Sequence, residues 1–299
     1  MSDLTLSVHG VVARLRGDDE ALAELASHFA AFVVTAASEA AFEVELTKGA
    51  PTLDVPNRLV ADQVVDRGVV YNLGDVTWVD HFGKATSRYD FAAERGSIVA
   101  RDVEDLVELG YLMVHSRLGV LLERRGLHRL HCIGVCVGAN AALVLAPSGG
   151  GKSRLAIAIL THTRAKLLGD DMVLVDRGGR VHGFHSPIGV STKEQGEALG
   201  SVRSFRRRLH PPKWIVELDA LGARLADGPV DPRLIVLARR VSEGPSALVP
   251  LSPWDIRAAL WRDLVIGLGL PQVLELVARL PPRLAPAWPI MLNMLRNGL

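Results

Sequence analysis

The chain has 299 residues, of which 48% are hydrophobic and 22% are charged, so it can bury a sizeable core and is not expected to be intrinsically disordered. Its formal net charge is +1, which excludes the basic surplus typical of proteins that bind nucleic acids or acidic membranes through bulk electrostatics. No uncharged apolar run approaches the roughly 18 residues that a membrane helix needs. We expect one large or two modest domains, with no nucleic-acid or membrane partner.

The first 125 residues predict a small α+β domain. Residues 5–16 alternate in hydropathy and predict a strand, after which Asp18 and Asp19 open an amphipathic segment that predicts a helix to about residue 37. Further short strands are predicted at 42–46, 67–73, 76–79, 86–91 and 97–100. Residues 103–125 fit a buried helix that Gly126 ends. No catalytic motif is recognisable here, and the role left to this domain is substrate recognition.

A second domain is predicted at 126–250, followed by a C-terminal helical segment at 251–299. Residues 130–137 and 141–145 predict a hairpin, and His131 stands at the start of its first strand. Cys132 and Cys136 fall on one face of that strand, a geometry that does not favour a mutual disulfide. Because the first residues also lack a secretory pattern, we expect reduced cysteines and a cytoplasmic protein.

The second strand of this hairpin leads into Ala146-Pro-Ser-Gly-Gly-Gly-Lys-Ser153 and then into an amphipathic helix. Strand, glycine-rich loop and helix in this order are typical of a phosphate-binding loop, although the motif has glycine where this chain has Ala146. Glycines let successive backbone N–H groups turn toward phosphate oxygens, a lysine reaches the terminal phosphates, and a serine hydroxyl holds Mg²⁺. The predicted nucleotide-binding residues are Ser148, Gly149, Gly150, Gly151, Lys152, Ser153, Arg154 and Lys213.

Asp170 and Asp171 lie between two further predicted strands, 166–169 and 172–176. We expect the first of these strands to lie beside the loop strand and to deliver two carboxylates to the phosphates. One carboxylate can hold Mg²⁺, and the other can accept the proton of an attacking hydroxyl. Repulsion between the two charges would raise one pKa, which suits a base.

Beyond the acid pair, 180–184 predicts the second strand of a hairpin, 191–212 a charged loop, 214–218 and 234–238 two strands, and the tail from 253 a set of short helices. His182 and His185 suggest a metal site only weakly, since no acid or cysteine falls at matching spacing. The dense basic run could be a solvated loop or a clamp on phosphates or an acidic substrate. Its members are Arg203, Arg206, Arg207, Arg208, His210 and Lys213.

His131, the loop ending in Lys152-Ser153, and Asp170-Asp171 before an apolar strand together resemble the kinase core of HPr kinase/phosphorylase and its relatives. The resemblance covers roughly residues 127–238. It implies a β-rich P-loop fold related to phosphoenolpyruvate carboxykinase, with ATP and Mg²⁺ as cofactors and a homo-oligomeric assembly. It also implies that His131 and Asp170 handle the proton of the acceptor, while Ser153 and Asp171 lie near the metal.

The chain is more similar to divergent members of this family, some of which phosphorylate peptide natural products or small molecules. We therefore predict an ATP- and Mg²⁺-dependent kinase with Asp170, His131 and Lys152 as catalytic residues. Its acceptor would be a serine hydroxyl of a peptide, such as a ribosomal peptide precursor, or of a protein, or a hydroxyl of a small metabolite. The alternatives are a nucleotide-binding scaffold without catalysis and a P-loop ATPase.

Overall fold

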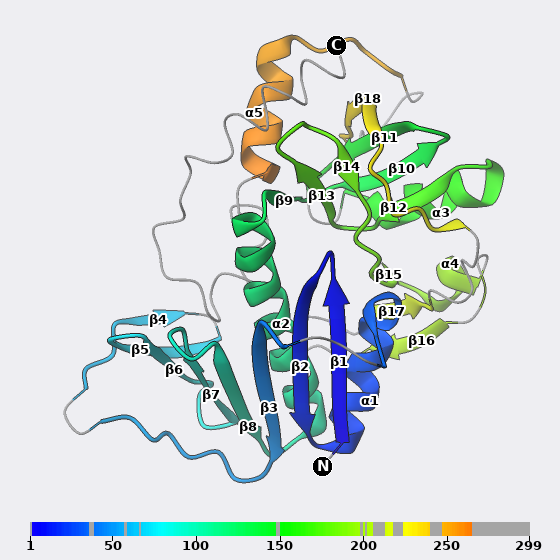
Figure 1. Cartoon of the computed structure of the whole chain (residues 1–299). Coiled ribbons are helices and arrows are strands. Elements are labelled where there is room, and N and C mark those ends of the chain that lie inside the picture. The colour runs from blue at the N-terminus through cyan, green and yellow to red at the C-terminus, as the bar shows by residue number, and fades with distance from the viewer. Residues whose placement is uncertain are drawn as a thin grey trace. The chain divides into compact units, whose positions relative to one another are not determined.

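The structure is a computed structural model (Figure 1), and it describes residues 2–35, 39–56, 59–65, 67–147, 150–197, 200, 202–205, 213–217, 224–239 and 247–264. The protein is a mixed α/β fold that is rich in strands and has several sheets, as the sequence predicted. It divides into two compact units, whose main segments join between Leu122 and Glu123. Among the described helices, none is both long and apolar enough to cross a membrane.

The first unit is built on one eight-stranded sheet, in which two neighbouring pairs, β2–β3 and β3–β8, are parallel and the others are antiparallel. A parallel pair needs a crossover, and α1 (Asp19–His28) lies in the one between β2 and β3. In spatial order the strands are β1 (Ser2–Val8), β2 (Val11–Gly17), β3 (Phe42–Lys48), β8 (Arg95–Ala100), β7 (Ala85–Asp90), β6 (Val76–Asp80), β5 (Gly68–Leu73) and β4 (Gln63–Val65).

Two predictions for this unit are wrong. The strand expected at 5–16 is the hairpin of β1 and β2, because His9 and Gly10 both have positive φ and reverse the chain within a continuous alternating pattern. Asp18 caps α1 as its position suggested, but the helix ends at His28 and a short 3-10 helix (Ala30–Phe32) follows. The chain leaves the helix early because Val34 N–H donates to Thr5 O at 3.0 Å, which ties it to β1.

Helix α2 (Val103–Arg124) matches the predicted buried helix, and Gly126, at φ +81°, follows its end. Buried residues occur on all sides of the helix, so the unit must neutralise the charged side chains that it carries there. Glu108 accepts a hydrogen bond from Arg67 Nη1 at 2.8 Å, and Arg117 pairs with Glu94.

The second unit is built around a four-stranded sheet with the order β12 (Lys166–Gly169), β10 (Ile133–Val137), β11 (Asn140–Leu145) and β18 (Asp231–Leu237). The predicted hairpin of β10 and β11 is present and turns at Gly138, whose φ is +58°. β11 runs parallel to β18 and antiparallel to β10. Leu143 and Val144 are both buried, in separate clusters, so β11 is covered on both faces.

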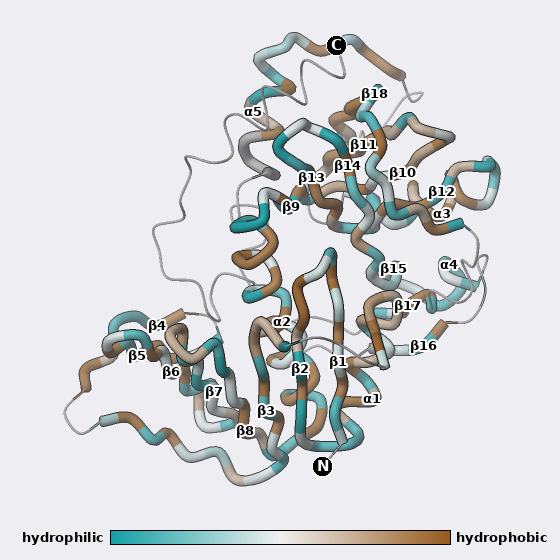
Figure 2. Tube along the Cα trace, in the orientation of Figure 1, coloured by the Kyte–Doolittle hydropathy of each residue, from teal (hydrophilic) through white to brown (hydrophobic). Residues whose placement is uncertain are grey.

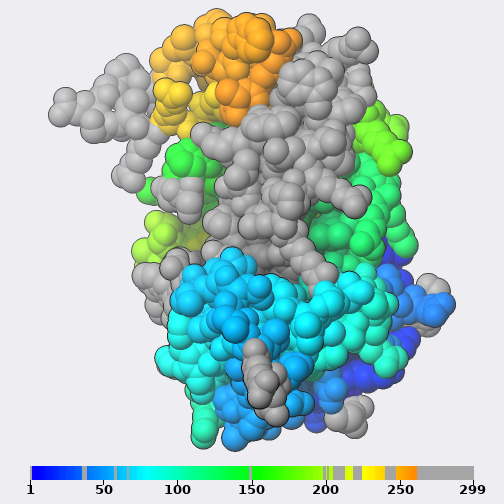
Figure 3. Space-filling view, turned by 90° about the vertical axis from the view of Figure 1, so that its left-hand side faces the viewer, coloured from blue at the N-terminus to red at the C-terminus, as the bar shows by residue number. Residues whose placement is uncertain are grey.

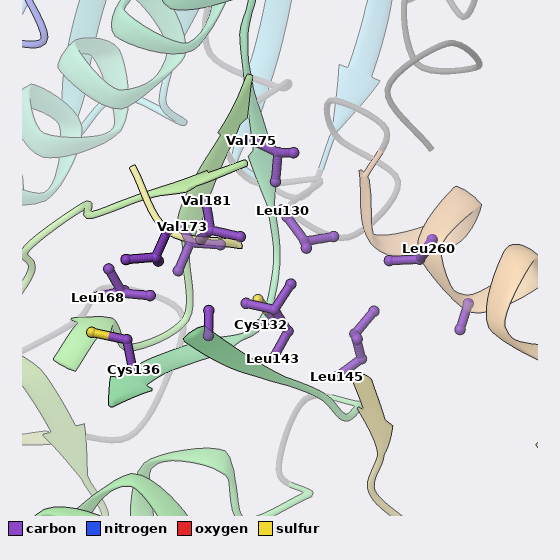
Figure 4. Close-up of a cluster of buried hydrophobic side chains, with 13 residues drawn as sticks. Leu130, Cys132, Cys136, Leu143, Leu145, Leu168, Val173, Val175, Val181 and Leu260 are labelled. Atoms are coloured by element: carbon purple, nitrogen blue, oxygen red, sulfur yellow. The ribbon is translucent and has the colours of Figure 1, made fainter. Parts of the chain in front are cut away.

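One face of this sheet packs in a cluster with β9 (Leu127–Leu130), β13 (Val173–Asp176), β14 (Val181–His182) and α5 (Pro253–Leu264), as Figure 4 shows. Gly134 allows the close approach, because a Cβ there would lie 2.5 Å from Val173 Cγ1. The other face packs against α3 (Lys152–His162) and a small sheet of β15 (Ile188–Val190), β17 (Lys213–Val216) and β16 (Val202–Phe205). In Figure 2, most of β13 is brown and the turn after it is teal.

Two predictions for the second unit need correction. The strand expected at 130–137 is two strands in different sheets, β9 and β10, and His131 lies between them. The loop expected at 191–212 contains α4 (Lys193–Glu197) and β16. These elements form because Val202 and Gly196 pack at β17, a long-range contact that local composition does not reveal. Of the predicted C-terminal helices, α5 is present, and residues 265–299 lie outside the described residues.

Candidate functional site

The predicted phosphate-binding loop connects β11 to α3, the order that its sequence required. Gly151 precedes the helix at φ +89°, a left-handed conformation that glycine adopts without steric cost. Gly150 N–H donates to Pro147 O at 2.9 Å, and a Cβ on Gly150 would lie only 2.8 Å from the same oxygen. Two glycines are therefore needed for the tight backbone of this turn. Ser148 and Gly149 lie outside the described residues.

Lys152 is the first residue of α3 and is buried, with 6% of its surface exposed. Its ammonium donates to Ala146 O at 2.8 Å and to Pro147 O at 3.4 Å, so the side chain folds back along the loop. An ammonium has three N–H groups, and these two contacts leave one for a phosphate oxygen. Arg154 lies in the same helical turn and is exposed.

Asp170 and Asp171 form the turn that carries the chain from β12 in one sheet to β13 in another. Asp171 has φ +65°, a conformation that short polar side chains tolerate better than most. Gly169 precedes the pair, and a Cβ there would lie 2.0 Å from Met172 O. The turn therefore requires a glycine at 169 to position the two acids. The sequence pattern did not indicate this requirement.

Two side chains from separate segments hold the backbone of this turn. His131 Nδ1–H donates to Asp171 O at 2.8 Å, and Ser186 Oγ donates to Asp170 O at 3.2 Å. His131, which was predicted to handle the proton with Asp170, contacts the acid pair through the main chain of Asp171. Ser186 was missed, and its only signal in the sequence is that it precedes Pro187.

The loop and the acid pair meet where Ser153 Oγ donates to Asp170 Oδ2 at 2.9 Å. The family resemblance implied that Ser153 and Asp171 lie together near a metal, and the observed hydrogen bond joins Ser153 to the other member of the pair. The expected strand order is also wrong, because β10 lies between β11 and β12. The acids still reach the loop because β11 and β12 both run antiparallel to β10, so their C-terminal ends lie at the same end of the sheet.

Asp170 is a buried carboxyl group, 2% exposed, whose pKa is raised to about 7. Burial is the larger cause, and repulsion from the charge of Asp171 is the second. The hydrogen bond from Ser153 and the charges of Lys213 and Lys152 oppose this rise. Asp170 Oδ1 finds no hydrogen-bond partner within the described part of the chain. The site therefore contains an acid that changes charge near neutral pH beside a cationic phosphate-type loop.

Of the remaining predicted residues, some lie at this site and others lie elsewhere. Lys213 begins β17, packs against Gly189 and lies close enough to Asp170 to lower its pKa. Arg203 pairs instead with Glu217 at 2.6 Å, and residues 206–212 of the basic run lie outside the described residues.

The two histidines that suggested a metal site have separate partners. His182 pairs with Asp176 at 3.1 Å, and His185 pairs with Asp227 at 2.9 Å. Over the ranges that the structure describes, no three His, Cys, Asp or Glu side chains gather to hold a metal ion. These histidines therefore do not form a metal centre of their own there. Comparison of the sequence with models of protein families and with curated proteins finds no match.

Proposed function

We propose that the protein is a kinase that transfers the γ-phosphoryl group of ATP to a hydroxyl group. The observation that carries the proposal is the 2.9 Å hydrogen bond between Ser153, in a loop of phosphate-binding sequence, and Asp170, a buried acid with a pKa of about 7. A loop that binds phosphates and a carboxylate that can accept a proton are the two parts that phosphoryl transfer to an alcohol needs.

The loop and the start of α3 would bind the phosphates of ATP. Backbone N–H groups at the N-terminus of a helix attract anions, and Lys152 adds a full positive charge there. Lys213 brings a second ammonium to the Asp170 side of the site. Both cations would stabilise the negative charge on the group in transfer.

The residues present also fit Mg²⁺, which prefers oxygen ligands and keeps several waters when it binds a nucleotide. Ser153 Oγ and the Asp171 carboxylate are hard oxygen donors that would hold it, and the unsatisfied Oδ1 of Asp170 would gain a partner nearby. Because substrate phosphates complete such a site, two protein ligands are enough. When bound, the metal neutralises charge on the phosphate oxygens.

Asp170 would accept the proton of the acceptor hydroxyl. With a pKa of about 7, a large fraction of this group is ionised at neutral pH, and it remains basic enough to accept a proton. The acceptor oxygen forms a bond to the γ-phosphorus, the bond from that phosphorus to the oxygen of ADP breaks, and the hydroxyl proton moves to Asp170. His131 and Ser186 keep the carboxylate in place by holding the carbonyl groups of the acid pair.

The same residues support a relationship to the HPr kinase family. In this proposal the second unit is a β-rich P-loop core, since β11 runs antiparallel to β10 and parallel to β18, unlike the strands of a doubly wound parallel sheet. Divergent members of that family suggest the acceptor class, a serine of a peptide or protein or the hydroxyl of a small metabolite.

The test is mass spectrometry for added phosphate on serine-containing peptides and small alcohols incubated with the protein and Mg-ATP. Asp170→Asn should reduce transfer by about 100-fold or more while ATP affinity stays within a few-fold of the original. Asp231→Asn, at a half-buried acid of the same unit, is the matched control and should retain transfer.

Two results would contradict the kinase proposal. ATP binding without a phosphorylated product from any acceptor would favour a nucleotide-binding scaffold. Phosphate release at the same rate with and without acceptor would favour an ATPase.

A further inference from the structure

The first unit has a pocket on the outward face of its sheet. Strand pairing aligns Trp78 on β6 with Arg88 on β7, and Arg88 with Ser97 on β8. Since alternate residues of a strand point to opposite faces, these three side chains share one face. Their neighbours Val79 and Ile98 are buried on the opposite face. The outward face thus carries a tryptophan among polar residues.

The segment between β3 and β4 covers this face. Gly49 N–H donates to Ala100 O on β8, and Asp62 N–H donates to Val70 O on β5, each at 2.8 Å, so the ends of the segment are fixed at strands on either side of β6 and β7. Trp78 is only 8% exposed beneath this cover. Figure 3 views the unit from the side on which this segment, in blue, lies with the cyan strands.

A pocket of about 510 Å³ remains between the segment and the sheet. This volume lies within the range of roughly 300 to 1,000 Å³ that is usual for small-molecule sites. The sheet lines it with Trp78, Thr86, Ser87, Arg88, Ser97 and Val99, and the segment with Thr52, Leu53, Asp54 and Pro56. Its walls come from three strands and a segment tied down at both ends.

The charges in the lining are balanced. Arg88 and Asp54 are the two charged residues, one of each sign. The guanidinium of Arg88 lies 5.9 Å from the centroid of the Trp78 ring and contacts Asp90 Oδ2 at 3.2 Å, so its charge is already partly neutralised and its plane is held. A ligand with net charge would therefore gain little here, because attraction to one group is offset by repulsion from the other.

The polar groups suit hydroxyls. Arg88 has five N–H donors, of which the contact with Asp90 uses one, and Asp54 is an acceptor with two oxygens. Thr86 and Ser97 can both donate and accept. Ser87 differs, because its hydroxyl contacts buried His81 Nε2 at 3.0 Å and is thereby held in place. An aromatic surface beside such groups matches a molecule with hydroxyls on its edge and C–H groups on its face.

We infer that this pocket binds a neutral, hydroxyl-rich small molecule of monosaccharide to disaccharide size. Hydroxyls of such a ligand would accept from Arg88 and donate to Asp54, while its C–H face packs near Trp78 and Val99. The inference concerns the first unit alone and does not depend on phosphoryl transfer in the second.

Isothermal titration with glucose, galactose, mannose, myo-inositol, sucrose and maltose tests this inference. At least one compound should bind the full chain with a dissociation constant below about 10 mM, and Arg88→Gln should weaken that binding about tenfold or more. Arg95→Gln is the matched control, because Arg95 is an arginine of neighbouring β8 that does not line the pocket. Its affinity should stay within about twofold of the original.

A second variant protects the test against a folding defect. Val99→Phe fills the pocket without touching the Arg88 ion pair, and it should abolish binding while the unfolding temperature changes little. Failure of all six compounds at about 10 mM would overturn the inference. Binding that survives both Arg88→Gln and Val99→Phe would also overturn it, as would binding confined to charged probes such as gluconate, glucosamine or glycine.

Discussion

Both units of the chain bury a carboxylate, and each compensates it in its own way. Glu108 in the first unit is 6% exposed and contacts the guanidinium of Arg67, itself 5% exposed, at 2.8 Å. Asp170 in the second unit is 2% exposed and accepts a hydrogen bond from a neutral hydroxyl, that of Ser153. One acid has an opposite charge in direct contact, whereas the other has two lysines that act only at longer range.

The difference separates an acid with a counter-ion in direct contact from an acid whose pKa lies near neutral pH. A buried acid in direct contact with its counter-ion is compensated, and removal of either partner leaves the other as an uncompensated buried charge. A buried charge without such contact is destabilised, and the pKa of Asp170 rises to about 7 as a result. The second unit thus contains an acid that costs stability near neutral pH and can exchange a proton there.

The largest effect is expected from breaking the compensated pair. Arg67→Ala leaves the Glu108 carboxylate buried without its guanidinium, which should lower the free energy of unfolding by about 3 to 5 kcal/mol in a urea titration. Arg16→Ala, at an exposed pair with Asp3, should cost no more than about 1 kcal/mol. If the double variant Arg67→Met with Glu108→Leu is no more stable than Arg67→Ala, the loss does not come from an uncompensated charge.

Gly169→Ala should disturb the turn that presents the reactive acid. The added Cβ would meet Met172 O at 2.0 Å, a backbone atom, so the turn must shift at a cost of about 3 kcal/mol and phosphoryl transfer should be lost with it. Gly49→Ala is the control, since the nearest atom to its Cβ lies 3.9 Å away. Unfolding curves and transfer assays on both variants check this prediction, and equal behaviour of the two would contradict it.

Asp170→Asn should stabilise the protein, because it removes the buried acid of the second unit. Its folded pKa of about 7 exceeds the ordinary value of 3.8, so the folded state binds more protons than the unfolded state between these values. The contribution of this acid to stability therefore falls as pH rises from about 4 to 7. The asparagine variant lacks this loss and should be more stable by about 4 kcal/mol at pH 8, with no gain below pH 4. A gain that is the same at pH 4 and pH 8 would contradict the assignment.

The smallest effect concerns the backbone of the same turn. Asp171 has φ +65°, which glycine adopts more readily than alanine. Asp171→Gly should therefore be more stable than Asp171→Ala by about 1 kcal/mol in thermal unfolding. Both variants remove the same carboxylate, so their difference isolates the backbone. Equal stability would mean that the turn relaxes to negative φ once the side chain is gone.

Local pattern was enough to predict the elements that lead into the site. β11, the glycines at 150 and 151 and α3 lie in one continuous stretch, and the spacing of apolar residues shows where the strand ends and the helix begins. Asp170 and Asp171 could be selected because they follow an apolar strand shortly after a loop of phosphate-binding sequence, where carboxylates have a role. The limits of α2 were also predictable, since its apolar residues recur until a glycine.

Long-range contacts explain why other predictions from the sequence differ from the structure. The break between β9 and β10 depends on segments that are distant in sequence, and so does the position of β10 between β11 and β12. The same holds for the acid that Ser153 contacts. The close approach at Gly169 and the hydrogen bond from Ser186 likewise exist only once the chain is packed.

The sequence by itself determined that a glycine-rich loop links a buried strand to a helix and that two acids follow at a fixed distance along the chain. These are local features, set by backbone preferences and hydrophobic periodicity within a few residues. Only the tertiary structure decided that Asp170 is the acid that meets Ser153 and that its pKa lies near 7. Burial and distance from opposite charge set that value, and both arise from packing of segments that are far apart in the chain.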